Sequence, residues 1–188
     1  MTRRNGHAAG RRAPKAKLPK SRQASTELIE IRDQIREAPS VDARAAAATH
    51  VGSLLTSAKL TPGERNAALA ILEKLTKDVE QEVRHALAVH VKNCAVLPPS
   101  IARDISEDVD AVAMPFIECS PVLTDADLLA IVGLGSTPKQ VAIARRESVS
   151  ERVSDALVAT RSGDVVTALL GNLQAAVRSE EHTSELQS

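Results

Sequence analysis

The stretch LTPGERNAALAILEKL, residues 60–75, decides the fold class. Its first residues predict a helix start, because Thr61 and Glu64 can each bind the other's backbone amide and Pro62 suits the first helical position. Apolar side chains then recur at the three- and four-residue spacing of one helix face. They are Ala68, Leu69, Leu72 and Leu75. The stretch therefore predicts an amphipathic helix.

Two further helices are predicted on its N-terminal side. Leu28, Ile31 and Ile35 follow the same helical spacing. Pro39 ends that helix, and Ser40 is a suitable cap for the alanine-rich helix that follows.

On the C-terminal side, the sequence has an internal period of 26 residues. Apolar residues align in three columns: Leu97, Leu123 and Val149; Ile105, Ile131 and Leu157; Ile117, Ile143 and Leu169. Capping and breaking residues surround these columns, so each unit predicts two helices of roughly 8–11 residues joined by a tight turn. Pro115 lies inside one of these helices and is expected to kink or shorten it. Units of this size cannot bury an apolar face alone, so neighbours must stack.

The composition agrees with a globular helical protein. Of 188 residues, 43% are hydrophobic, but Phe116 is the one aromatic residue and there is no Trp or Tyr. Alanine and leucine favour helices, and small side chains let helices approach closely. Such a chain lacks the large aromatic anchors that dominate tight interfaces and stack on bases.

Charge is distributed unevenly along the chain. Residues 1–22 contain eight basic residues and no acidic one, whereas residues 23–177 contain 15 basic and 21 acidic residues, a net charge of −6. Without apolar periodicity, residues 1–24 are predicted to be a disordered basic arm. The arm is either a solubilising tail or a contact for anionic partners.

The last residues, RSEEHTSELQS at 178–188, break the preceding pattern. At all 11 positions they resemble the in-frame translation of a common sequencing adapter. We therefore expect an artefact here and a helical domain at residues 25–177, whose natural C-terminus is missing.

The sequence predicts a cytoplasmic protein. No apolar stretch of about 7–15 residues follows the N-terminal charges, as a secretory signal requires. No apolar run approaches the roughly 18 residues of a membrane span. Cys94 and Cys119 do not suggest a disulfide framework.

The segment DVEQEVRHALA, residues 78–88, resembles the second helix of HEAT repeats. The resemblance implies that Asp78 and Arg84 form a structural polar pair between neighbouring repeats, since an arginine fork can hold a carboxylate or exposed carbonyls. The 26-residue unit is shorter than the about 40–47 residues of ordinary HEAT repeats.

Residues from about 26 to 177 are similar to an uncharacterised, mainly alphaproteobacterial family, domain of unknown function 2336. The segments that carry the similarity are residues 60–65, 78–88, 120–129, 141–146 and 149–157. The resemblance implies short HEAT-like helical repeats stacked as an α-solenoid, and it supplies no catalytic residues.

Candidate chemical sites are few. His90 and Cys94 lie four residues apart and offer two metal ligands, whereas zinc sites need three or four. We interpret Cys94 and Cys119 as small buried residues. His85 follows Glu82 by three residues, but acid–base catalysis also needs a pocket and a partner.

Two other patterns have structural interpretations. Asp125 and Asp127 fall in the first turn of a predicted helix, where the macrodipole favours acidic residues. The segment Gly133-Leu-Gly135 lacks the lysine and spacing of a phosphate loop and is interpreted as a helix-ending turn. We therefore predict no catalytic, cofactor-binding or metal site, and a protein that is not an enzyme.

Three functions remain open at this point. The first is a non-catalytic scaffold that binds a protein partner. The second is nucleic-acid binding through the basic arm and a positive patch, although the body is acidic and lacks stacking aromatics. The third is a regulatory module of a longer signalling protein. The candidate patch, or else ordinary outer-face charge, consists of Lys139, Arg145, Arg146, Arg152 and Arg161.

Overall fold

The computed structural model describes residues 20–37, 40–57 and 59–172 of the chain. Within these ranges the regular structure is helical and no strand occurs, so the predicted all-α class is confirmed. The helices are α1 (Lys20–Arg36), α2 (Val41–Ser57), α3 (Pro62–Leu75), α4 (Gln81–Val91), α5 (Pro99–Glu107), α6 (Asp110–Cys119), α7 (Asp125–Gly133), α8 (Thr137–Ala144) and α9 (Glu151–Ala159). Residues 163–172 are also helical.

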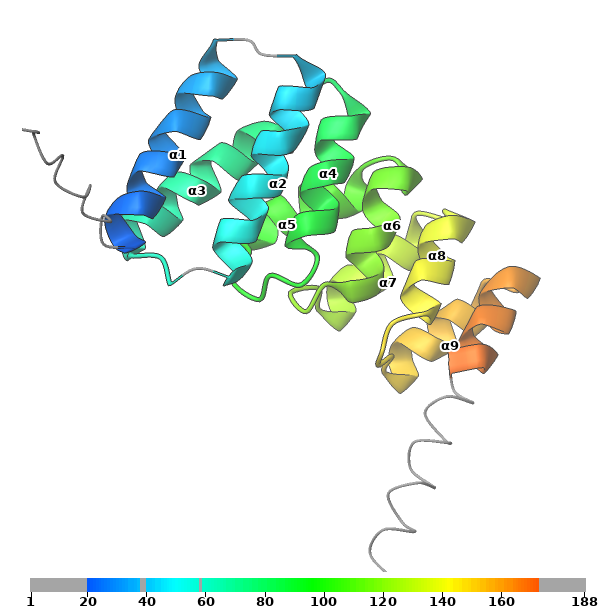
Figure 1. Ribbon diagram of the computed structural model, residues 1–188. Helices are drawn as coiled ribbons and strands as arrows, with labels where there is room; N and C mark the ends of the chain where they lie inside the picture. Colours follow the sequence, from blue (N-terminus) through cyan, green and yellow to red (C-terminus); the bar gives the residue numbers. More distant parts are fainter. Residues whose placement is uncertain (1–19, 38–39, 58, 173–188) are drawn as a thin grey trace, which may run out of the picture.

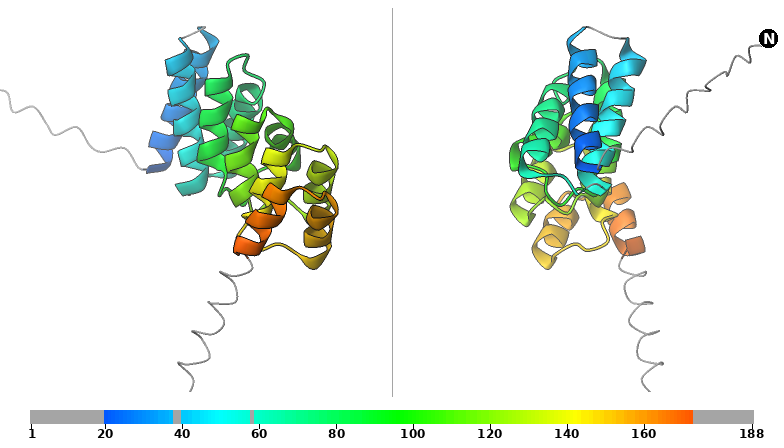
Figure 2. Two further views of the ribbon diagram at one scale, coloured as in Figure 1. Left: turned by 90° about the vertical axis from the view of Figure 1, so that its right-hand side faces the viewer. Right: turned by 60° about the vertical axis from the view of Figure 1, so that its left-hand side comes forward.

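The helices form consecutive pairs in chain order, α1 with α2, α3 with α4, and so on to α9 with segment 163–172. One row consists of α2, α4, α6 and α8, each packed on the next (Figure 1). On the other side, α5 contacts α7 and α7 contacts α9, while α1 packs on both α2 and α3. The pairs therefore follow one another from α1 at one end to segment 163–172 at the other (Figure 2).

The predicted starts of α2 and α3 are confirmed. The Ser40 hydroxyl accepts a hydrogen bond from the Ala43 amide at 3.3 Å, at the start of α2. At α3, the Thr61 amide donates to Glu64 Oε2 at 2.8 Å, and the Glu64 amide donates to the Thr61 hydroxyl at 3.3 Å. This reciprocal pair satisfies two amides that a helix start otherwise leaves without a partner.

Helix α1 begins before the predicted domain boundary. We expected residues 1–24 to be disordered, but α1 starts at Lys20. The reason is that its apolar face extends one turn back from Leu28 to Ala24, and both side chains are buried. Residues 1–19 lie outside the described ranges.

From α5 onward, the helix caps keep a constant spacing. The N-cap residues of α5, α7 and α9 are 26 residues apart: Pro98, Thr124 and Ser150. Their C-cap residues are also 26 apart: Asp108, Leu134 and Thr160. Equivalent helices in this part thus begin and end at equivalent positions of the 26-residue period.

Two residues with unusual backbone properties, Gly52 and Pro115, lie in the row formed by α2, α4, α6 and α8. Gly52 of α2 lies against α4, and a Cβ atom added there would stand 2.8 Å from His90 Cβ. Only glycine allows this approach, because Cβ atoms do not come so close. Pro115 was expected to kink or shorten α6, but the helix continues for four further residues to Cys119. The next side chain, Phe116, is fully buried.

Candidate interaction surface

Ion pairs join the first three helix pairs. The guanidinium of Arg44 in α2 donates to both carboxylate oxygens of Asp78, at 2.7 and 3.1 Å. The guanidinium of Arg84 in α4 binds Asp108 in the same two-pronged way, at 2.6 and 3.0 Å. The four side chains are between 10% and 19% exposed. These contacts are shielded enough to position the helices strongly.

The pKa of Asp78 depends on its partial burial and on its hydrogen-bond partners. Burial opposes ionisation of Asp78, but the hydrogen bonds from Arg44 and from the Glu80 amide outweigh it. The pKa of Asp78 therefore lies below its ordinary value. The hydrogen bond to Asp108 raises the pKa of Arg84.

Asp78 and Arg84 were predicted to be one polar pair. The structure places their charged groups on different partners, Arg44 and Asp108. Arg84 contacts Asp78 through the backbone, by donating to the Asp78 carbonyl at 2.7 Å. Sequence reasoning missed Arg44, because its partner lies 34 residues away.

Cations also bind the carbonyl ends of helices in the later pairs. Lys139 of α8 donates to the carbonyls of Ser106 and Asp108, at 2.9 and 2.6 Å. Arg146 donates to the carbonyl of Ile117, and to that of Ser120 at 2.9 Å. Helix ends leave carbonyls without intrahelical partners, and side chains of the following pair bind them here.

The next pair repeats this arrangement with a neutral residue. Asn172 donates to the carbonyls of Ala144 and Arg146, at 2.9 and 2.6 Å. Serine hydroxyls add links at the opposite helix ends: Ser136 donates to Asp110 and Ser150 to Asp125, each at 2.7 Å. Polar side chains thus tie successive pairs at both ends.

The predicted positive patch is therefore corrected. Lys139 is only 6% exposed, and Arg146 is half-buried with burial lowering its pKa. Both cations are used between helices and are withdrawn from an outer surface. The Arg146 contact is incomplete, since its Nε atom and the Ser120 hydroxyl lack hydrogen-bond partners in the described chain. Arg145, Arg152 and Arg161 are exposed.

The other candidate residues have ordinary positions. Cys94 is buried, but Cys119 was expected to be buried and is exposed at the last position of α6. Asp127 completes a capping box with Thr124, and these hydrogen bonds lower the pKa of Asp127. Gly135 lies in the turn after α7 with φ +79°, so this segment ends a helix as predicted. In the described ranges, no three His, Cys, Asp or Glu side chains gather to hold a metal ion.

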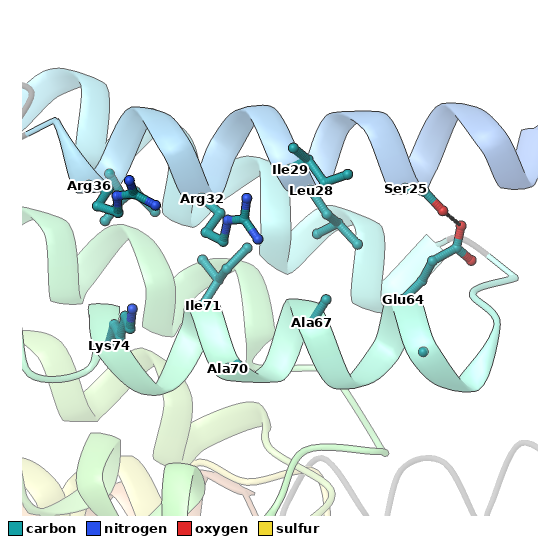
Figure 3. Close-up of a pocket in the computed structure, with 12 residues that line it drawn as sticks. Ser25, Leu28, Ile29, Arg32, Arg36, Glu64, Ala67, Ala70, Ile71 and Lys74 are labelled. Carbon is teal, nitrogen blue, oxygen red and sulfur yellow. Dashed lines mark hydrogen bonds between the residues drawn. The ribbon is translucent and has the colours of Figure 1, made fainter.

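A groove lies between α1 and α3, with a volume of about 740 Å³ (Figure 3). Its walls are Ser25, Leu28, Ile29, Arg32, Ile35, Arg36, Gly63, Glu64, Ala67, Ala70, Ile71 and Lys74. A second groove, between α5 and α7, has a volume of only about 130 Å³. The sequence carries a local signal for the larger groove. Small residues at Gly63, Ala67 and Ala70 follow helical spacing beside the buried face of α3.

The two ends of this groove differ in charge. At one end Glu64 is 7% exposed, accepts a 2.6 Å hydrogen bond from Ser25, and closes the α3 capping box. The hydrogen bonds from Ser25 and Thr61 lower the pKa of Glu64. Toward the other end lie three cations: Arg36 and Lys74 are outermost, and Arg32 lies nearer the middle beside Ile71 (Figure 3).

Comparisons with known proteins place the chain near one family. The family described as "Uncharacterised protein conserved in bacteria (DUF2336)" matches residues 112–184, which include α7, α8 and α9. The match contains the similar segments at 120–129, 141–146 and 149–157, but not those at 60–65 and 78–88. It also extends into the predicted adapter segment, as far as residue 184.

No curated protein and no solved structure matches the chain. Among the described residues, none of the helices is both long enough and apolar enough to cross a membrane.

Proposed function

We propose that this chain is a non-catalytic scaffold, built as an α-solenoid of short HEAT-like repeats, whose outer surface binds a protein partner. The carrying observation is the pattern of helix contacts. Within the described ranges, every extensive contact joins helices of the same pair or of consecutive pairs. Nearest-neighbour contact of this kind characterises solenoids, which expose long surfaces to partners.

The use of charged residues supports this proposal. The buried or half-buried cations Arg44, Arg84, Lys139 and Arg146 bind carboxylates or carbonyls of adjoining pairs. Their role is to hold the stack together. The α1–α3 groove, by contrast, has exposed apolar and basic side chains that do not serve the stack.

Site-specific photo-crosslinking of the full chain in living bacterial cells tests the proposal. A photoreactive amino acid is placed at exposed positions of α1, α3, α5 and α7, one position at a time. We expect discrete protein adducts at adjacent positions, reduced by excess unlabelled protein. A uniform, uncompeted background at every position would contradict the scaffold function.

The nucleic-acid hypothesis is tested in parallel by titration with duplex and single-stranded DNA. Two of the five cations proposed for that function are engaged between helices, which favours the protein partner. Binding that weakens steeply with salt, and disappears when residues 1–19 are removed, would replace the scaffold proposal with electrostatic nucleic-acid binding.

A further inference from the structure

The α1–α3 groove has the shape of a site for one more helix. Its two walls run parallel, because Ser25 meets Glu64 at one end while Arg36 and Lys74 lie at the other (Figure 3). Lining residues recur every three or four positions on both walls. Such ridges accept the ridge of another helix between them.

The groove is apolar along its floor and open above. Leu28 and Ile71 are buried, but Ile29 is 51% exposed. Ala67 and Ala70 are exposed on the α3 wall, where their small side chains leave the space that forms the groove. From Ser25 to Arg36 the wall covers 12 residues, a rise of about 16 Å, which accommodates roughly three turns of a helix. An open trough with two ridged walls suits an amphipathic helix better than an acyl chain, which needs enclosure.

The charge of the groove specifies the partner further. Arg36 and Lys74 lie in the last turns of α1 and α3, where cations also complement the helix dipoles. Two helix ends carry together about one negative charge, which leaves the three cations of this end in excess. Arg32 binds Asp33 at 3.0 Å, but this pair is about half exposed and weak enough for a partner carboxylate to compete with it.

We propose that the α1–α3 groove binds an acidic amphipathic helix of a protein partner. The helix lays its apolar face over Ile29 and Ile71 and directs carboxylates toward Arg36 and Lys74. The proposal rests on the scaffold function and names the site and the chemistry of the partner. An interface of three turns is small, so we expect dissociation constants in the micromolar range, on the order of 1–100 μM.

A display selection tests this proposal directly. A library of random 14-residue peptides is selected against the full chain, and enriched peptides are measured individually by fluorescence polarisation. We expect enrichment of helix-forming sequences with apolar residues at three- and four-residue spacing and glutamate or aspartate near one end. Enrichment of basic or non-helical peptides would overturn the proposal.

Three groove variants and two matched controls locate the binding site. Ala67→Arg and Ala70→Arg fill the groove from exposed helical positions, where arginine costs little stability. Each is expected to weaken peptide binding at least about tenfold, a loss of about 1.4 kcal/mol. Ala130→Arg is the matched control, since Ala130 is an exposed helical alanine of the smaller α5–α7 groove. The double variant Arg36→Glu/Lys74→Glu should lose acidic peptides, while the control Lys59→Glu/Lys77→Glu, at exposed positions outside the groove, should retain them.

The outcomes separate the two proposals. Peptides that bind the groove variants as well as they bind the control variants place the interaction elsewhere on the chain and overturn the groove, while the scaffold function stands. A selection without any enriched peptide overturns the groove proposal, while the photo-crosslinking experiment decides the scaffold function. Vesicles of phosphatidylglycerol and phosphatidylcholine form the last arm. If they bind and the groove variants abolish that binding, the groove serves a lipid surface and the helix proposal fails.

Discussion

The first and last parts of the stack are held together by different interactions. In the part from α1 to α4 the helices have 11 to 17 residues, and carboxylate–guanidinium pairs connect neighbouring helix pairs. In the part from α5 to α9 the helices have only 8 to 10 residues, and side chains of the following pair bind backbone carbonyls. The two parts meet at Asp108, whose carboxylate binds Arg84 and whose carbonyl binds Lys139.

Helix length explains this difference. Every helix leaves its last four carbonyls without intrahelical partners, which is half of an eight-residue helix such as α8 but less than a quarter of α2. Short helices therefore depend more on hydrogen-bond donors from neighbouring helices to satisfy their backbone carbonyls. Long helices meet over larger faces, and their polar contacts orient them rather than complete their hydrogen bonding.

The largest effect is expected at the close contact of α2 and α4. Gly52→Ala brings a Cβ atom against His90 Cβ, which cannot move without its helix, so we expect a loss of about 2–4 kcal/mol in the free energy of unfolding. Gly133→Ala in α7 is the matched control. Its added Cβ meets nothing within 4 Å, and we expect no loss of stability. Urea unfolding of both variants measures the difference, and equal behaviour would contradict the close-contact explanation.

The next effect distinguishes the two kinds of link by their pH dependence. Asp78→Asn removes the ion pair with Arg44 and should cost about 1–2 kcal/mol at pH 7, as should Lys139→Met, which leaves two carbonyls without donors. Because the folded-state pKa of Asp78 is lowered, its contribution is present above the unfolded pKa of about 4 and is lost as the pH falls further.

The measurement for this second prediction is urea unfolding at several pH values between 7 and 3.5. The stability gap between the wild type and Asp78→Asn should shrink toward the acidic end. The gap for Lys139→Met should persist, since carbonyl oxygens do not titrate there. A constant gap for Asp78→Asn would argue against an ionised, paired carboxylate.

A smaller effect compares the capping boxes of the two parts. Thr61→Ala and Thr124→Ala each remove a cap, and such losses cost about 0.5–2 kcal/mol. We expect the greater loss for Thr61→Ala, because its partner Glu64 is buried and also binds Ser25 of α1. Thermal unfolding ranks the two variants, and the reverse order would mean that α1 does not depend on this cap.

The smallest effect concerns the turn after α9. Arg161 has φ +57°, a left-handed conformation in which a side chain is strained. Arg161→Gly relieves the strain but increases the freedom of the unfolded chain, so we expect a gain of only about 0.5–1 kcal/mol. A rise in melting temperature supports this balance, whereas a fall would show that the arginine side chain stabilises the turn.

Local signals in the sequence predicted most of the fold. The start of α3 follows from Thr61, Pro62 and Glu64, and the short helices follow from caps spaced by 26 residues. In both cases the interacting residues lie within a few positions of one another, so the pattern can be recognised in the sequence without knowledge of the fold. The start of α1 was placed too late because basic residues before Ala24 concealed its first turn.

Contacts between residues far apart in the sequence could not be predicted from local signals. Arg44 and Asp78 are 34 residues apart, and Lys139 reaches back 31 residues to Asp108. Nothing local distinguishes a lysine that binds carbonyls between helices from one that lies in solvent. The α1–α3 groove has the same origin, since it exists only where two separate helices place their small and basic residues side by side.

The constant cap spacing from α5 onward has a genetic consequence. Residues 124–149 extend from one N-cap to the residue before the next. An in-frame duplication of these 26 codons would add a copy of α7 and a copy of α8. Each copy would lie between neighbours equivalent to those of the original helix. A deletion of the same codons would remove Thr124 and place Ser150, the next N-cap, directly after residue 123 in its position. This part of the gene can therefore change in length by whole 26-codon units while its protein product keeps the same junctions between helices.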